Sequence, residues 1–255
     1  MRYFVTLSFD GTGYHGWQVQ PNGVTVQEVL ERCLSMLLRE PIEVVGAGRT
    51  DAGVHARRMV AHFDYEGDYE MDNLAYKLDH ALPQDISVWS VEPVSDDMHA
   101  RFSAKRRTYH YYIHTHKSPF LRKYSCQLHY QLDFEAMNQA AEVLREYEDF
   151  GAFCKAGSDV KTTLCKIYAA QWHQTSETEW YFKICANRFL RNMVRAVVGT
   201  LIEVGRGRMT LAEFRQVIEK GSRTGAGESM PAHALFLENV EYEAPTGAVG
   251  GAVCG

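Results

Sequence analysis

One carboxylate stands alone in a stretch that is otherwise free of acids. Asp51 is the only acidic residue between Glu43 and Asp64, and it lies in "GRTDAG", two residues after Arg49. An aspartate in a glycine-rich loop often makes only a local Asx-turn. However, glycines also let a ligand come close, and a neighbouring arginine favours an ionised carboxylate. With no second acid nearby for a carboxylate-pair hydrolase, a lone ionised aspartate suits a nucleophile better than a general acid.

Cations and aromatic residues alternate in two other stretches. "RFSAKRRTY", residues 101–109, carries four cations and no acid, and it ends at Tyr109. "NRFLRNMVR", residues 187–195, carries three cations and no acid. Its last residue, Arg195, borders an apolar helix face, where a partly buried arginine needs a carboxylate partner. We predict that these stretches and residues 49–58 converge on one positive cleft, and that the acidic run at residues 64–72 faces away from it.

The cysteines and histidines do not favour a metal site. None of the six cysteines forms a CxxC pair, so free and mostly buried thiols are the favoured interpretation. The eleven histidines contain no HExxH motif. His110, His114 and His116 share one strand-like stretch, but metal binding there is the less favoured alternative. The expectation is a protein without a metal or an organic cofactor.

Composition and charge limit the class of protein. The 255 residues suit one large domain or two small ones, and a hydrophobic fraction of 45% permits a sizeable core. A net charge of −5 argues against indiscriminate nucleic-acid binding but leaves room for a local basic site. The first ten residues do not form a signal peptide, and no apolar run approaches the roughly 20 residues of a membrane span. We therefore expect a soluble, cytoplasmic protein with no membrane contact.

The pattern of helices and strands predicts an α+β fold. Strands are expected at residues 2–9, 42–46, 58–65 and 85–94, with a helix at 26–38 that has a capping box at Thr25 and Glu28 and is stopped by Pro41. A second helix, capped by Asp72, runs to about Ala81. The order β-α-β-β-α-β is that of a ferredoxin-like unit.

The second half repeats this order. Strands are expected at residues 107–115, 162–174, 179–188 and 234–242. Helices are expected at 134–146, capped by Asp133, at 189–205, and after a cap at Thr210 and Glu213. We predict two ferredoxin-like halves, residues 1–100 and 101–243, with a joined antiparallel sheet and a central active-site cleft. The Ala/Gly-rich tail, residues 244–255, is predicted to be disordered.

Five motifs in order resemble the TruA-type tRNA pseudouridine synthases. They are "SFDGTGYHGWQVQ", "GAGRTDAGVHA", "RFSAKRRTYHYYI", "ANRFLRNMVRAVVGTLIEVG" and "MPAHALFLENVEY", and the likeness runs from Tyr3 to about Tyr242. The resemblance implies an isomerase that converts uridine to pseudouridine at positions 38, 39 and 40 in the anticodon stem-loop of tRNA. It implies tRNA as the partner, no cofactor and a homodimer.

The resemblance also implies roles for single residues. Asp51 would be the catalytic nucleophile, and Arg195 would pair with it. Tyr109 would lie against the base and act in proton transfer at C5. Arg49 would help to extrude the target base, and Leu235 would pack on the flipped uracil. The order of the first chemical step stays open: attack on C6, attack on C1′ or abstraction of a ribose proton.

Two positions depart from the family pattern, and three other functions remain as alternatives. Glu148 stands where the family often has a histidine, and Ala234 where it usually has glycine. One alternative is a non-catalytic RNA-binding module on the same fold, against which the set Asp51, Tyr109 and Arg195 argues. Another is a hydrolase of small nucleosides, against which the long basic stretches argue. The third is a pseudouridine synthase that acts on other tRNA positions or other RNAs.

Overall fold

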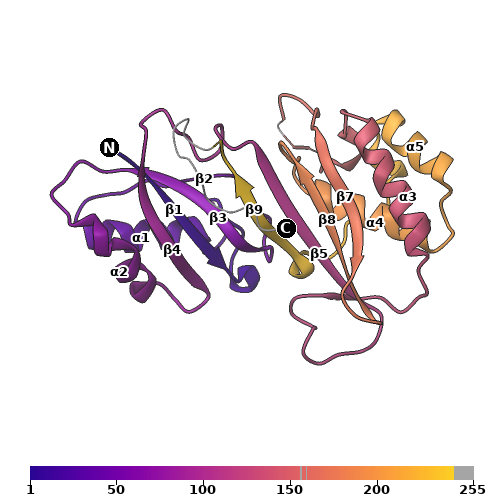
Figure 1. Ribbon diagram of the computed structural model, residues 1–255, viewed down its shortest axis with the longest axis horizontal. Helices are drawn as coiled ribbons and strands as arrows, with labels where there is room; N and C mark the ends of the chain where they lie inside the picture. The colour runs from indigo at the N-terminus through magenta and orange to yellow at the C-terminus, as the bar shows by residue number, and fades with distance from the viewer. Residues whose placement is uncertain (156, 159, 244–255) are drawn as a thin grey trace.

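A single large sheet runs through the computed structural model, which describes residues 1–155, 157, 158 and 160–243 (Figure 1). The strand order is β4-β1-β3-β9-β5-β8-β7, with β2 paired to β3 and β6 paired to β5. The first half of the chain supplies β1 (Arg2–Phe9), β2 (Val45–Gly46), β3 (His55–Asp64) and β4 (Ile86–Val94). The second half supplies β5 (Arg106–His114), β6 (Cys126–Gln127), β7 (Ile167–Gln174), β8 (Glu179–Ala186) and β9 (Leu235–Glu241).

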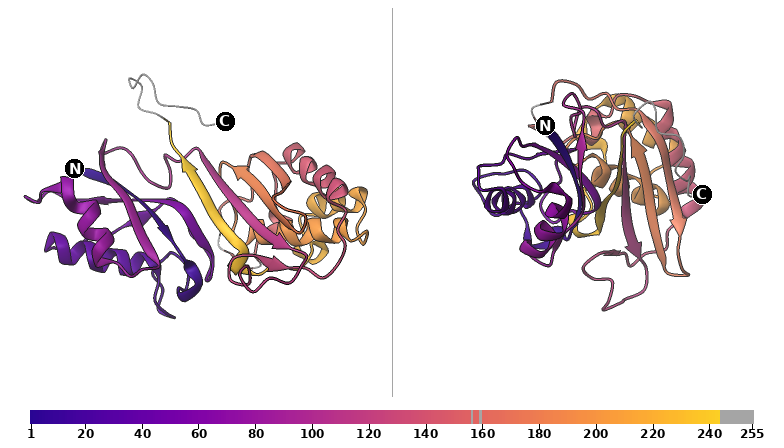
Figure 2. Two further views of the ribbon diagram at one scale, coloured as in Figure 1. Left: turned by 60° about the horizontal axis from the view of Figure 1, so that its bottom comes forward. Right: turned by 60° about the vertical axis from the view of Figure 1, so that its left-hand side comes forward.

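The helices gather at the two ends of the sheet (Figures 1 and 2). Helices α1 (Val26–Leu38) and α2 (Leu74–Ala81) lie with β1 to β4. Helices α3 (Phe134–Val143), α4 (Met193–Gly205) and α5 (Leu211–Lys220) lie with β5, β7 and β8. Within the described chain, no helix is both long and apolar enough to cross a membrane.

Both halves have the strand order of a ferredoxin-like unit. In the first half the order is β4-β1-β3-β2, and in the second it is β9-β5-β8-β7, so each runs fourth, first, third, second in chain order. The predicted α+β class with a mostly antiparallel sheet is confirmed. The division into domains at residues 1–100 and 101–243 stays a prediction, as does the central cleft. The predicted disorder of the tail lies outside the described residues.

The two halves join through a short parallel contact. Strand β9 pairs with β3 at only two positions, His55 with Phe236 and Ala56 with Leu237, and β9 is antiparallel to β5 on its other side. Strand β2 pairs with the other end of β3, at Ala61 and His62. The chain just before β3 therefore lies beside the last strand of the second half.

Alternating apolar residues build the core on one face of the strands. In β1 every second residue is buried, from Tyr3 to Phe9, and the side chains between them are half-exposed. The five cysteines in the described part of the chain are free and buried, as expected. Three helices begin with residues the sequence indicated. Thr25 caps α1 and Asp133 caps α3 through the side chain, and Thr210 with Glu213 forms a complete capping box at α5.

Some predicted boundaries were wrong, and each error has a local cause. Asp72 does not cap α2, because it lies in a 3₁₀ turn (Met71–Asn73) that leads directly into a helix beginning at Leu74. Helix α1 spans the predicted residues 26–38, but the residue that ends it is Arg39, in the left-handed region, rather than Pro41. Helix α4 begins at Met193 rather than at residue 189, because Asn192 takes a left-handed φ of 67°.

Candidate active site

The loop that carries Asp51 is pressed against the loop that follows β1. Trp17 N–H donates to the Thr50 carbonyl (3.4 Å), and Gly53 N–H donates to the Tyr14 carbonyl (3.3 Å). Gly16 has φ +84°, and a Cβ on it would lie 2.3 Å from the Thr50 carbonyl oxygen, so only glycine fits there. Gly53 has φ +77° and forms the turn that Val54 N–H closes onto the Asp51 carbonyl (3.1 Å). The glycines therefore fix the backbone on both sides of Asp51.

Two arginines from the second half of the chain hold the Asp51 carboxylate. Arg195 Nη1 lies 3.2 Å from Asp51 Oδ2, and Arg191 Nε lies 3.8 Å from Asp51 Oδ1. Arg195, in the first turn of α4, also donates through Nε to the Met230 carbonyl, and Met230 N–H donates back to the Arg195 carbonyl (3.1 Å). The Asp51 and Arg195 side chains are 25% and 21% exposed, so the pair is shielded but within reach of a ligand.

The Tyr109 phenol is buried, and its pKa responds to the charge of Asp51. Burial raises the pKa of the Tyr109 phenol to about 12, with Arg107 lowering it and Asp51 raising it. The ring is only 9% exposed, and Phe189 meets it edge-on at 5.1 Å between centroids. The phenol is therefore protonated at neutral pH and can donate a hydrogen bond.

Arg107 joins three separate stretches of chain and was not among the predicted site residues. Its guanidinium donates to the carbonyls of Ala47 (2.9 Å), Ala104 (3.0 Å) and Asn187 (2.7 Å), and also to that of Arg101. Burial lowers its pKa, and the nearby cations Arg101 and Arg188 lower it further. The signal in the sequence was its position two residues before Tyr109 in a strand, which turns it to the same inward face.

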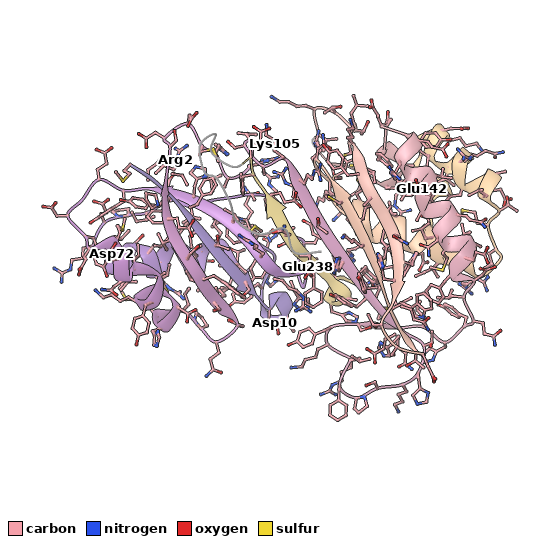
Figure 3. The ribbon with its side chains drawn as sticks, in the orientation of Figure 1. Arg2, Asp10, Asp72, Lys105, Glu142 and Glu238 are labelled. Atoms are coloured by element: carbon pink, nitrogen blue, oxygen red, sulfur yellow. The ribbon has the colours of Figure 1, made fainter. Side chains whose placement is uncertain are left out.

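The basic stretches meet only in part. Arg107, Arg191 and Arg195 lie around the Asp51 loop, as their contacts show. Arg191 precedes α4, so it reaches Asp51 from a loop rather than from the helix that was predicted to begin at residue 189. Arg106 instead lies over the Tyr168 ring, 4.7 Å from its centroid. The acidic run ends at Asp72, which lies at the outer end of the first half, far from the β3–β9 junction (Figure 3).

The remaining predicted residues lie around the same junction. Arg49 is exposed in the Asp51 loop, and no ion pair or hydrogen bond joins its side chain to another of the residues described. Leu235 is buried at the start of β9, opposite Tyr111 of β5, and its neighbour Phe236 pairs with His55 of β3. Ala234 is fully buried just before β9.

His55 is buried where β3 meets β9, four residues after Asp51. Its Nδ1 accepts from Gly11 N–H (3.0 Å) and also lies 3.0 Å from Asp10 Oδ1, and its Nε2 lies 3.0 Å from the His233 carbonyl. Its ring stacks on Phe236 at 4.6 Å. Burial lowers the pKa of His55, so the ring is a neutral structural group at neutral pH. Among the described residues, no three His, Cys, Asp or Glu side chains are grouped so that they could hold a metal ion.

Comparison with known proteins agrees with these motifs. The sequence profile of the family described as "tRNA pseudouridine synthase" matches residues 6–103 and 140–243. Proteins called tRNA pseudouridine synthase A are similar over nearly the whole chain. That of Bacteroides fragilis is 57% identical over 94% of this chain and 96% of its own length, and that of Bacteroides thetaiotaomicron is 56% identical over 94% and 90%.

More distant relatives share the same extent of likeness. The tRNA pseudouridine synthase A of Bacillus subtilis is 39% identical over 95% of this chain and all of its own length. A solved structure, CRISPR endoribonuclease Cse3 bound to a 19-nucleotide RNA, aligns with 80% of this chain at 9% identity and a TM-score of 0.23, too low to inform the fold. The profile match and the identities above 50% decide the matter: this chain belongs to the tRNA pseudouridine synthase family.

Proposed function

We propose that this protein isomerises uridine to pseudouridine at positions 38, 39 and 40 in the anticodon stem-loop of tRNA. The observation that carries the proposal is the Asp51 carboxylate, which Arg195 and Arg191 hold beside the buried Tyr109 phenol. Such a carboxylate has no other acid between residues 44 and 63 and is still a quarter exposed, which suits a group that attacks or deprotonates a ligand. Family membership supplies the reaction and the substrate class.

The proposed reaction keeps every atom of the substrate. The N1–C1′ glycosidic bond breaks, the uracil turns, a C5–C1′ bond forms, and the proton on C5 leaves while N1 gains one. The reaction requires no oxidant or reductant, since no electrons are gained or lost overall. Asp51 would start it, as nucleophile or as base. Extrusion of the base from the stem is required because the reacting atoms are inaccessible in a stack, and we assign Arg49 to that step.

Tyr109 and Leu235 would bracket the flipped base. Because the pKa of Tyr109 is raised to about 12, its phenol is protonated when the substrate arrives and donates a hydrogen bond first. To accept the C5 proton, Tyr109 would first have to give its phenolic proton to another group or exchange it with a bound water. Leu235 is buried at the start of β9, and we assign its side chain to packing on the uracil ring.

The test is to map pseudouridine in a tRNA transcript that carries uridine at all three positions. Wild-type protein should form pseudouridine without any added cofactor, and Asp51→Asn should form none while still binding the tRNA. The matched control is Asp64→Asn, because Asp64 is also paired with an arginine (Arg2, 2.8 Å) but lies at the other end of β3. Normal turnover by Asp51→Asn, or equal loss in both variants, would contradict the assignment.

The position and assembly of the reaction can be tested with the same protein. Pseudouridine formed only outside positions 38 to 40 would favour the alternative of another RNA target, and binding without any product would favour an RNA-binding module. We also propose, from the family resemblance, a homodimer that works in the cytoplasm. Sedimentation at micromolar concentration should give a mass of about twice the 29.0 kDa chain, and a single-chain mass would refute the dimer.

A further inference from the structure

A basic loop with an exposed aromatic tip connects β5 to β6. Residues 115–125, "THKSPFLRKYS", include Lys117, Arg122 and Lys123 and no acid. Phe120 is 88% exposed, more than any other large apolar side chain among the described residues. None of the three cations forms an ion pair with a residue in the described parts of the chain. The loop therefore offers free positive charge around an unburied ring.

This loop has a defined shape. Its base is closed by Thr115 N–H donating to the Thr178 carbonyl (2.9 Å) and by Leu128 N–H donating to the His114 carbonyl (2.9 Å). Near its tip, the N–H groups of Tyr124 and Ser125 both donate to the Leu121 carbonyl, at 3.0 and 2.9 Å. The loop extends beyond the ends of the strands in Figure 1 and in the right-hand view of Figure 2. A turn held in this way presents Phe120 and its neighbouring cations at little further entropic cost on binding.

The loop also contacts residues that lie where β3 meets β9, beside the candidate active site. Tyr124 donates through its hydroxyl to Asp10 Oδ2 (2.8 Å), and its ring meets the His55 ring edge-on at 5.3 Å. His233 Nε2 lies 3.3 Å from the Ser125 carbonyl. Asp10 lies beside the base of this loop in Figure 3. Since His55 follows Asp51 by four residues, the loop contacts the strand that begins just after the Asp51 loop.

We propose that residues 115–125 form a second RNA-contacting element, in which Phe120 stacks on an unpaired base of the substrate and the three cations bind backbone phosphates. The inference rests on the proposed function for its choice of RNA as the occupant. Aromatic side chains flanked by cations bind single-stranded nucleic acid through stacking and phosphate contacts together. The contact lies outside the pocket for the reacting uridine, and its role is to position the substrate rather than to take part in the reaction.

The experiment uses an anticodon stem-loop RNA with 2-aminopurine at single unpaired positions. Stacking changes the fluorescence of 2-aminopurine, so at least one position should respond to wild-type protein and to Phe120→Trp, and lose the response with Phe120→Ala. Phe120→Ala should weaken RNA binding about 5- to 100-fold. The matched control is Tyr76→Ala, because Tyr76 is also a highly exposed aromatic (66%) but lies on α2, and it should bind RNA normally.

A second variant tests the cations. Replacing Lys117, Arg122 and Lys123 together by alanine should lower the slope of log affinity against log salt by about 2 units. Thermal melting should be unchanged in both sets of variants, because the replaced side chains are exposed.

The outcomes separate this inference from the proposed function, since pseudouridine is measured in the same reactions. If wild-type protein makes no pseudouridine but the Phe120-dependent signal persists, the proposed function fails and the loop contact stands. If pseudouridine forms and Phe120→Ala binds RNA as tightly as wild type, the loop contact is refuted. Phe120-dependent binding to vesicles of anionic phospholipid, with RNA binding unchanged, would also refute it.

Discussion

Replacing Arg195 by methionine removes the guanidinium that holds Asp51 and keeps an apolar chain of similar length. The variant leaves a carboxylate that is only 25% exposed with one weaker partner, Arg191 at 3.8 Å. Removing one partner of a fully buried pair costs about 3–5 kcal/mol. Because Asp51 is a quarter exposed and keeps Arg191, we expect a loss of about 2–3 kcal/mol in the free energy of unfolding.

A double-mutant cycle isolates the pair from the other contacts of Arg195. The hydrogen bond from Arg195 Nε to the Met230 carbonyl is lost in both Arg195→Met and the double variant with Asp51→Asn, so it cancels. We expect a coupling energy of about 1–3 kcal/mol between Arg195 and Asp51. Unfolding by guanidinium cannot be used for this cycle, because that denaturant is itself a salt, so urea is the denaturant of choice.

The control is the same cycle on Arg2 and Asp64. That pair has a shorter separation, 2.8 Å, but the Asp64 side chain is 59% exposed, so its coupling should be about 0–1 kcal/mol. At 1 M salt the coupling of Arg2 with Asp64 should vanish, while that of Arg195 with Asp51 should largely persist. A coupling between Arg195 and Asp51 below about 0.5 kcal/mol, or one no larger than that of the control, would refute the view that burial makes this pair strong.

Four further outcomes are expected. Tyr109→Phe should lower turnover by about 100-fold or more if the phenol moves a proton, and a change within twofold would exclude that role. Burial lowers the pKa of His62 to about 4, so the native state resists protonation of this ring. About 3 kcal/mol of the free energy of unfolding should therefore be lost as the pH falls from about 6.5 to 4. In urea titrations, His62→Asn should make the free energy of unfolding depend less steeply on pH. Arg191→Ala should weaken all tRNAs equally and reduce the log–log salt slope by about 0.7–0.9, whereas a slope as steep as wild type would argue against a phosphate contact. Activity should survive EDTA in buffers where the tRNA stays folded, and restoration by one particular metal would contradict metal-free chemistry.

Much of the fold could be predicted because the relevant signals are local. The alternation in β1 and the capping residues Thr210 and Asp133 act over a few residues, and the structure has them as the sequence indicated. The repeated order of strands and helices gave two ferredoxin-like units by the same means. Boundaries were less certain where backbone conformation alone decided them, as at Asn192 before α4 and at the 3₁₀ turn that contains Asp72.

The sequence by itself singled out the residues that we propose carry the chemistry. It set Asp51 apart as a lone acid among glycines and arginines, and the motif around it indicated the family that the comparisons then established. What it left to the tertiary structure is the meeting of groups far apart in the chain. Asp51 and Arg195 are separated by 144 positions, and no local pattern encodes their contact.

The tertiary structure decided three features of the site. The parallel contact of β9 with β3 involves two residue pairs, too few to leave a signature in the sequence, yet it brings the start of β3 beside the second half. Arg191 reaches Asp51 from a loop, and Arg107 ties together three stretches through backbone carbonyls. Backbone carbonyls are the same in every residue, so the partners of Arg107 cannot be read from side-chain types; only the packing of the two halves determines them.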